Sequence, residues 1–195
     1  MALQRPPLAQ IRSLTLERSV ALMTGGAVAI DIRQVEDYFD VHIPGSISLQ
    51  YEFGPGMTGR ARDCLPLDVE LVLLEDGRGL ASEVAAGLRG KGFSVAGVLT
   101  DAFGQWGTRH ENFSSTPLIV APSPPDGYLL SVGDPGSPMY DNATFISIEE
   151  LWNRTGEVPS DEPVILISAR GIRAAMAIGM LERNGITDIT VWKRG

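Results

Sequence analysis

The sequence predicts an α/β protein in which a parallel sheet is flanked by helices and is followed by a second, partial copy of the same unit. Short apolar runs alternate with helical patterns, which is typical of βαβ units around a parallel sheet. The segment 73–98 also aligns without a gap with the segment 166–191, so that Glu75 lies over Ser168 and Gly92 over Gly185. Two copies of one strand, loop, helix and strand unit are therefore expected.

Each element follows from its residue pattern. Runs rich in Val, Ile and Leu without strict alternation predict strands buried on both faces, at residues 27–32, 69–74, 94–99, 163–168 and 189–192. Apolar residues at helical spacing predict helices, at residues 14–23, 80–89, 148–152 and 172–183. The Asn184-Gly185 pair supplies a stop after the last helix.

The two copies differ in length. We expect a first domain over residues 10–108, a linker rich in Pro, Gly and Ser over residues 109–143, and a partial second unit over residues 144–195. About 50 residues bury little core alone. The second unit is therefore expected to pack against the first, against linker strands such as 116–120, or against another chain, with a homodimer as one expectation.

Composition excludes several classes of function. The 16 basic and 24 acidic residues give a net charge of −8 and no basic patch, so we expect neither nucleic-acid nor membrane binding. Apolar stretches are too short for a membrane span, and the N-terminus lacks a signal-like apolar core, which predicts a cytoplasmic protein. With one cysteine, Cys64, and two histidines, His42 and His110, neither a metal site nor a cofactor is predicted.

The segment 29–46, AIDIRQVEDYFDVHIPGS, carries an Asp-x-Arg motif, an acidic-aromatic pair and a His-Ile-Pro-Gly turn. It closely resembles the corresponding part of rhodanese-like sulfurtransferase domains. The resemblance implies structural roles: Asp31 and Arg33 form ion pairs at the strand end, and His42, Pro44 and Gly45 shape the turn. It continues to residues 99–106, LTDAFGQW, where Phe103 replaces one glycine of the family's closing motif.

In this family the active loop follows a strand, opens a helix and reads Cys-x-x-Gly-x-Arg. A thiolate at a helix N-terminus has a lowered pKa and holds a transferred sulfur as a persulfide. The second copy replaces this cysteine by serine and keeps the glycine and arginine, in Ser168, Ala169, Arg170, Gly171, Ile172 and Arg173. The corresponding loop of the first copy runs from Glu75 to Leu80 and keeps neither the cysteine, nor the glycine, nor the arginine at these positions.

The resemblance therefore predicts a non-catalytic binding or regulatory module, in which residues 168–173 form a vestigial oxyanion pocket. The alternative is a sulfurtransferase that uses Cys64, whose thiolate Arg60 and Arg62 would favour, or a cysteine from a partner chain. Expected partners are a small oxyanion and a protein or second copy. The arrangement also resembles the tandem rhodanese tail of metallo-β-lactamase-fold hydrolases, although the hydrolase's own His-x-His-x-Asp-His motif is absent.

Two further patterns are typical of other activities but lack the sequence context that these activities need. The glycines at 54, 56 and 59 match a dinucleotide-binding fingerprint, but no strong strand precedes them, so a loop is predicted there. Ser168 lacks the GxSxG context of a serine hydrolase and has no evident histidine partner.

Overall fold

The computed structural model describes residues 10–51, 56–109, 112–133, 140, 142–168 and 171–195. The helices are α1 (Leu16–Thr24), α2 (Val35–Asp40), α3 (Gly56–Cys64), α4 (Ala81–Gly90), α5 (Ala102–Thr108), α6 (Ile148–Arg154) and α7 (Ile172–Glu182), with a 3-10 turn, η1 (Thr155–Glu157), after α6. The strands are β1 (Val28–Asp31), β2 (Ile47–Ser48), β3 (Glu70–Leu74), β4 (Ser94–Leu99), β5 (Leu118–Ala121), β6 (Tyr128–Ser131), β7 (Thr144–Phe145), β8 (Val164–Ile167) and β9 (Ile189–Arg194).

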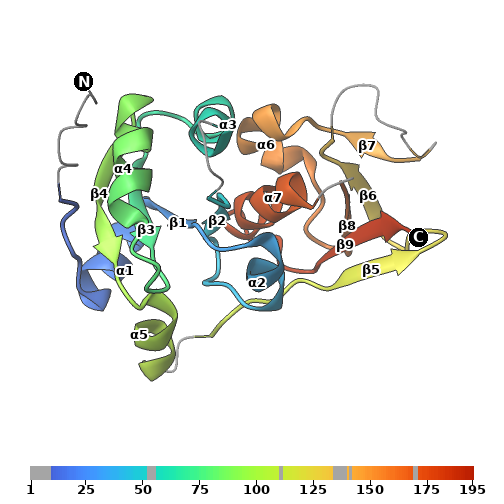
Figure 1. Ribbon diagram of the computed structural model, residues 1–195. Coiled ribbons are helices and arrows are strands. Elements are labelled where there is room, and N and C mark those ends of the chain that lie inside the picture. The colour runs from blue at the N-terminus through green and yellow to red at the C-terminus, as the bar shows by residue number, and fades with distance from the viewer. Residues whose placement is uncertain (1–9, 52–55, 110–111, 134–139, 141, 169–170) are drawn as a thin grey trace, which may run out of the picture.

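These strands form two parallel sheets, as Figure 1 shows. The first has the order β2-β1-β3-β4 and the second β5-β9-β8-β6-β7. Every pairing within either sheet is parallel. The predicted α/β class, with parallel sheets flanked by helices, is therefore confirmed.

The internal repeat predicted from the sequence corresponds to a repeated structural unit. The order β3, α4, β4 in the first sheet recurs as β8, α7, β9 in the second. The turns after the two helices also match, because Gly92 and Gly185 have φ of 98° and 82°. This left-handed conformation is accessible to glycine at little cost, which explains why both copies have glycine at this position.

A single apolar core joins the two units. Strand residues of both sheets, including Val28, Leu73 and Leu166, belong to one cluster with residues of α3, α4, α6 and α7. Figure 1 shows α2, α3, α6 and α7 between the sheets. On the other face of the first sheet, α1 and α5 cover a smaller cluster that includes Leu74 and Trp106. The partial second unit thus packs directly against the first.

The outer face of the second sheet differs from the expectation that both faces carry helices. Leu129, Ile165 and Trp192 are buried there in a cluster of their own, with the Tyr140 ring edge-on to Trp192 at 4.8 Å. Among the residues that the structure describes, no helix lies on this cluster. The helices in the described part of the second unit therefore lie on its inner face.

The two units approach most closely where α7 crosses β2. A Cβ atom added to Gly179 would lie 2.0 Å from the Ser46 carbonyl oxygen, so only glycine permits this crossing. Beside it, the Glu182 carboxylate accepts a hydrogen bond from the Gly45 N–H at 2.7 Å and lies 3.0 Å from His42 Nε2. A buried carboxylate of the second unit is thus held by the turn of the first.

The glycine-rich segment before Cys64 and the expected linker both contain regular secondary structure. The prediction of a loop at glycines 54, 56 and 59 is wrong in its last part, because α3 begins at Gly56 and includes Gly59. Met57, Ala61 and Cys64 are buried along one side of this helix, at the spacing of an amphipathic helix. The segment 109–143, expected as a linker with a strand at 116–120, contains β5 and β6 of the second sheet, and β5 (Leu118–Ala121) corresponds to that expected strand. Within the described parts of the chain, no helix is long and apolar enough to cross a membrane.

Candidate functional site

The two copies of the loop follow equivalent strand ends. Glu75 comes directly after β3 and Ser168 directly after β8, as the repeat predicts. In open parallel sheets, ligands bind outside the carboxyl ends of the strands, where the loops lead into helices. These two loops are therefore the positions at which the fold offers a binding site.

The first loop is closed by its own carboxylate. Glu75 is only 7% exposed, and its Oε1 atom accepts a hydrogen bond from the Ala81 N–H at 3.1 Å. Ala81 is the first residue of α4, so the carboxylate occupies the end of the helix where backbone N–H groups lack partners within the helix. An anionic ligand at this helix end would have to displace Glu75.

Arg78 does not compensate for this closure. Its Nε atom donates to the Asp76 carboxylate at 3.0 Å, and its Nη2 atom donates to the Ile32 carbonyl oxygen at 3.2 Å. The guanidinium of Arg78 thus connects the loop to the chain after β1 and does not stand over Glu75 as a cation for a ligand.

The second loop lies against the first unit. Ser168 is 7% exposed, and Gly171 precedes α7 in the left-handed region with φ of 74°. A Cβ atom at Gly171 would be 3.5 Å from Val35 and 3.6 Å from the Phe39 ring, both on α2. Residues 169 and 170, the middle of the predicted anion loop, lie outside the described residues. The described part is therefore a loop end covered by α2.

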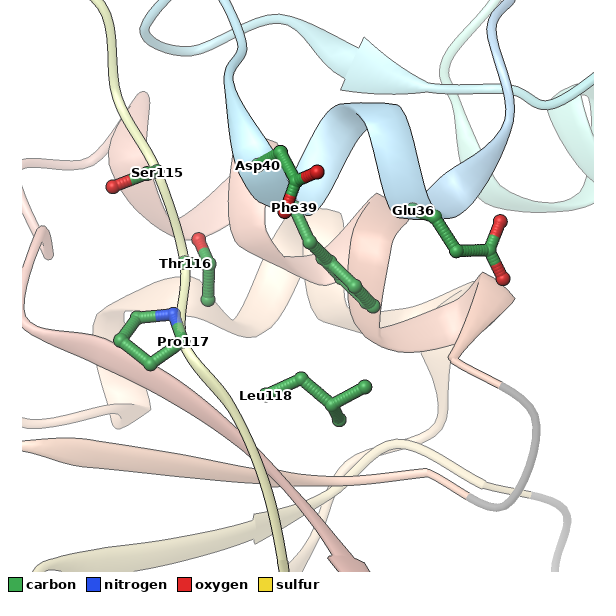
Figure 2. Close-up of a pocket in the computed structure, with 7 residues that line it drawn as sticks. All are labelled: Glu36, Phe39, Asp40, Ser115, Thr116, Pro117 and Leu118. Carbon is green, nitrogen blue, oxygen red and sulfur yellow. The ribbon is translucent and has the colours of Figure 1, made fainter.

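A pocket of about 390 Å³ lies next to this loop end (Figure 2). Its lining comes from α2 and from the chain leading into β5: Glu36, Phe39, Asp40, Ser115, Thr116, Pro117 and Leu118. The Phe39 ring belongs both to the pocket and to the surroundings of Gly171. The two carboxylates give this pocket an acidic lining, which opposes the binding of an oxyanion inside it.

Cys64 lies elsewhere and is not poised to act as a nucleophile. It is the last residue of α3, and its thiol is buried. The pKa of Cys64 is raised to about 12, mainly by burial and in addition by the negative charges of Glu149 and Asp63. Arg60 and Arg173 act in the opposite direction but are outweighed. The thiolate that sulfur chemistry requires is therefore scarce at neutral pH.

The Asp-x-Arg motif forms a compact ion pair at the end of β1. Arg33 Nη2 lies 2.8 Å from the Asp31 carboxylate and also donates to the Val41 carbonyl oxygen at 2.7 Å. The Phe103 ring covers the guanidinium, with 3.5 Å between the guanidinium carbon and the ring centroid. The residue that replaces a glycine of the rhodanese pattern thus contacts the motif directly.

The His-Ile-Pro-Gly turn contributes to the contact between the two units. The His42 ring stacks on Tyr38 at 4.1 Å, and its Nδ1 atom lies 2.8 Å from the Tyr38 carbonyl oxygen. Pro44 precedes Gly45, which has φ of 71° and directs its N–H to Glu182. The predicted structural residues therefore reach α7, a contact that sequence spacing alone did not indicate.

No family model and no curated protein sequence matches the chain. Solved structures do resemble it. A variant of EanB in complex with hercynine matches with a TM-score of 0.50 and 15% identity, over 96% of this chain and 60% of EanB. The 3-mercaptopyruvate sulfotransferase SseA from Escherichia coli matches with a TM-score of 0.45 and 12% identity, over 95% of this chain and 98% of SseA. The chain therefore shares the overall fold of the EanB variant.

The matched regions include both units of the chain. A thiosulfate sulfurtransferase from Pseudomonas aeruginosa matches over 94% of this chain and 43% of its own length, with a TM-score of 0.44 and 18% identity. These matches extend over nearly the whole chain. At identities this low, the likeness concerns the fold alone.

Sequence reasoning located the two loop positions but missed the pocket. Glu36 and Phe39 stand on a six-residue helix, and Leu118 stands in a segment expected as linker. The acidic-aromatic pair of the sequence motif gives no indication of a pocket. Among the described residues, no three His, Cys, Asp or Glu side chains are grouped to hold a metal ion.

Proposed function

We propose that this rhodanese-fold chain is a binding or regulatory module that carries no sulfur on its own loops. One observation carries the proposal: the two strand ends at which the fold would present a sulfur carrier hold Glu75 and Ser168. A serine hydroxyl is hardly ionised near neutral pH, and a carboxylate has no sulfur to exchange. We also propose that the chain corresponds to the tandem rhodanese tail of metallo-β-lactamase-fold hydrolases, which its arrangement of units resembles.

The ligand proposed for the module is a small oxyanion at the second loop, residues 168–173. Support comes from the 11-residue helix α7, whose N-terminal N–H groups favour an anion, and from Arg173 in its first turn. The first loop offers no equivalent site because Glu75 already occupies the end of α4. Binding is therefore expected at one loop of the two.

The alternative, a sulfurtransferase that uses Cys64, conflicts with the geometry. A buried thiol with a pKa of about 12 supplies little thiolate for attack on thiosulfate. The test is sulfur transfer from thiosulfate to cyanide by the unaltered chain and by Cys64→Ser. We expect both proteins to show only the uncatalysed rate. Turnover that disappears in Cys64→Ser would overturn the proposal.

Anion binding is tested by thermal unfolding with added thiosulfate, sulfate or phosphate. We expect a rise in Tm that Arg173→Gln removes, because binding to the native state alone stabilises it. Arg78→Gln is the matched control, since Arg78 is engaged with Asp76 in the closed first loop, and it should leave the rise intact. An equal response of both variants would contradict a site at the second loop.

A further inference from the structure

We propose that β5 is a contact surface for a second copy of this chain. In this dimer, the two β5 strands pair antiparallel about a two-fold axis at Ile119. The proposal is independent of the proposed ligand and rests on the exposure of β5, its free backbone groups and the charges beside it.

The strand β5 is an unusually apolar edge. It is the last strand of the second sheet and pairs only with β9 among the described residues, as Figure 1 shows at the rim of the molecule. Leu118, Ile119 and Val120 are 49%, 37% and 61% exposed. Edge strands are normally protected by charges, bulges or a covering element, because their free N–H and C=O groups attract another strand. The strand β5 itself contains no charged residue.

The backbone of β5 fixes which groups are free. The carbonyl oxygens of Pro117 and Ala121 accept hydrogen bonds from the β9 side, at 2.8 Å from Val191 and 3.2 Å from Gly195. Bonding direction alternates along a strand, so Ile119 also faces β9, whereas Leu118 and Val120 direct their N–H and C=O groups outward.

The flanking residues restrict the register. Pro122 has no N–H, and the N–H of Thr116 is already bonded to the Phe39 carbonyl oxygen at 2.9 Å. Leu118 and Val120 are thus the outward-facing residues whose N–H and C=O groups both lack a partner among the described residues. Placing Leu118 opposite Val120 of the second copy pairs the N–H and C=O groups of both residues, and the symmetry-related pair does the same, so that all four outward groups of each copy are bonded. Moving the two-fold axis by one residue in either direction would place Thr116 or Pro122 opposite an outward-facing residue and would lose hydrogen bonds. One register is therefore favoured, and with it a closed dimer over an open chain of copies.

Charge complementarity supports a second copy as the occupant. Val120 is in register with Lys193 of β9, and side chains in register share a face of the sheet. Leu118 lies on this same face and lines the acidic pocket with Glu36 and Asp40 (Figure 2). Antiparallel pairing therefore brings the exposed Lys193 of one copy toward the two carboxylates of the other, and does so twice.

Cross-linking tests both the dimer and its register, in a Cys64→Ser background. Ile119→Cys places two thiols across the axis, where opposed residues that are not hydrogen-bonded have Cα atoms about 4.5 Å apart, within disulfide range. Leu118→Cys is the matched control: in this register the two Leu118 Cα atoms are about 8 Å apart, beyond the reach of a disulfide. We expect mild oxidation to yield a covalent dimer of the first variant and little of the second.

Sedimentation equilibrium of the unaltered chain provides a second test. A four-residue edge is a small contact, so we expect a reversible dimer. Its dissociation constant should lie between about 1 µM and about 1 mM, as for transient interfaces. Val120→Lys should weaken dimerisation about tenfold or more, and Lys193→Glu about two- to fivefold. Leu67→Lys, which changes a 37% exposed apolar residue elsewhere, should not affect it.

Three results would overturn the proposal. The first is a monomer over the whole concentration range, which would mean that β5 is free or is covered by a different protein. The second is equal cross-linking of the two cysteine variants, which would indicate random collision. The third is a dimer that Val120→Lys does not weaken, which would place the contact on another surface.

Discussion

At the scale of single residues, the clearest consequence concerns Cys64. Its pKa is raised to about 12 from an ordinary value of 9.0, first by burial and then by Glu149 and Asp63. At pH 8 we expect iodoacetamide to modify native Cys64 about a thousandfold more slowly than an exposed cysteine, because reaction requires the thiolate. The measurement is the alkylation rate by mass spectrometry, with urea-unfolded protein as the control. Fast modification of the native protein would contradict the burial of this thiol.

The same pKa shift predicts a dependence of stability on pH. The unfolded chain releases the Cys64 proton near pH 9, whereas the folded chain retains it to about pH 12. The contribution of Cys64 to the free energy of unfolding should therefore be fully present below pH 9.0. It should decrease as the pH rises from 9.0 to about 12. Urea unfolding at several pH values should show a shallower fall for Cys64→Ser, because serine does not titrate there. Identical slopes would mean that the thiol is not desolvated.

Restoring the missing sulfur tests the two loops against each other. In a Cys64→Ser background, Ser168→Cys places a thiol before Gly171 and Arg173 at the N-terminus of α7, an environment that lowers a thiol pKa. We expect it to react with iodoacetamide faster than native Cys64 and to form a persulfide with thiosulfate. Glu75→Cys should react less, because Arg78 and Leu80 stand where the glycine and arginine belong. Equal inertness of both variants would count against an anion site at the second loop.

At the scale of elements, the crossing of α7 over β2 depends on one glycine. Gly179→Ala would force a Cβ atom against the Ser46 carbonyl oxygen, so we expect it to lower the free energy of unfolding by about 1–3 kcal/mol or more. Gly90→Ala is the matched control within α4, where a Cβ atom meets nothing within 4 Å, and it should be neutral or stabilising by up to about 1 kcal/mol. Denaturant unfolding measures both. Similar effects would mean that α7 can shift away from β2 at little cost.

The elements that the sequence predicted are those with a strong local signal. The apolar runs at 69–74 and 94–99 became β3 and β4, and the helical pattern at 172–183 became α7. The two-residue strands β2 and β7 have no periodicity to detect, since their existence depends on partners far along the chain. The loop positions could be predicted because they repeat. The pocket between α2 and the approach to β5 could not, because tertiary packing alone brings Glu36 and Leu118 together.

At the scale of the whole molecule, the two sheets share their interior. Residues of both units belong to one core cluster, and Glu182, Gly179 and Arg183 of the second unit contact the first. Arg183 donates to the Ala27 carbonyl oxygen at 3.3 Å, and partial burial of its guanidinium lowers its pKa. Removing either unit would expose a large part of this shared core. The stability of each unit therefore depends on the other.

Shared packing predicts a single cooperative unfolding transition for the whole chain. Trp106 lies on α5 of the first unit and Trp192 on β9 of the second, so each reports on one unit. The pair Trp152→Phe with Trp192→Phe leaves Trp106 as the fluorophore, and Trp152→Phe with Trp106→Phe leaves Trp192. Within each variant, we expect the fluorescence midpoint in urea to coincide with the midpoint of far-UV circular dichroism.

The Gly179→Ala change adds a further test, because it acts at the contact between the units and lies on α7, which carries neither tryptophan reporter. Added to each single-tryptophan variant, it should lower the fluorescence midpoint of Trp106 and that of Trp192 by the same amount. A shift confined to Trp192, or two separate midpoints in the parent variants, would mean that the second unit unfolds while the first stays folded. Equal shifts would establish that the partial unit and the first unit form one cooperative structure.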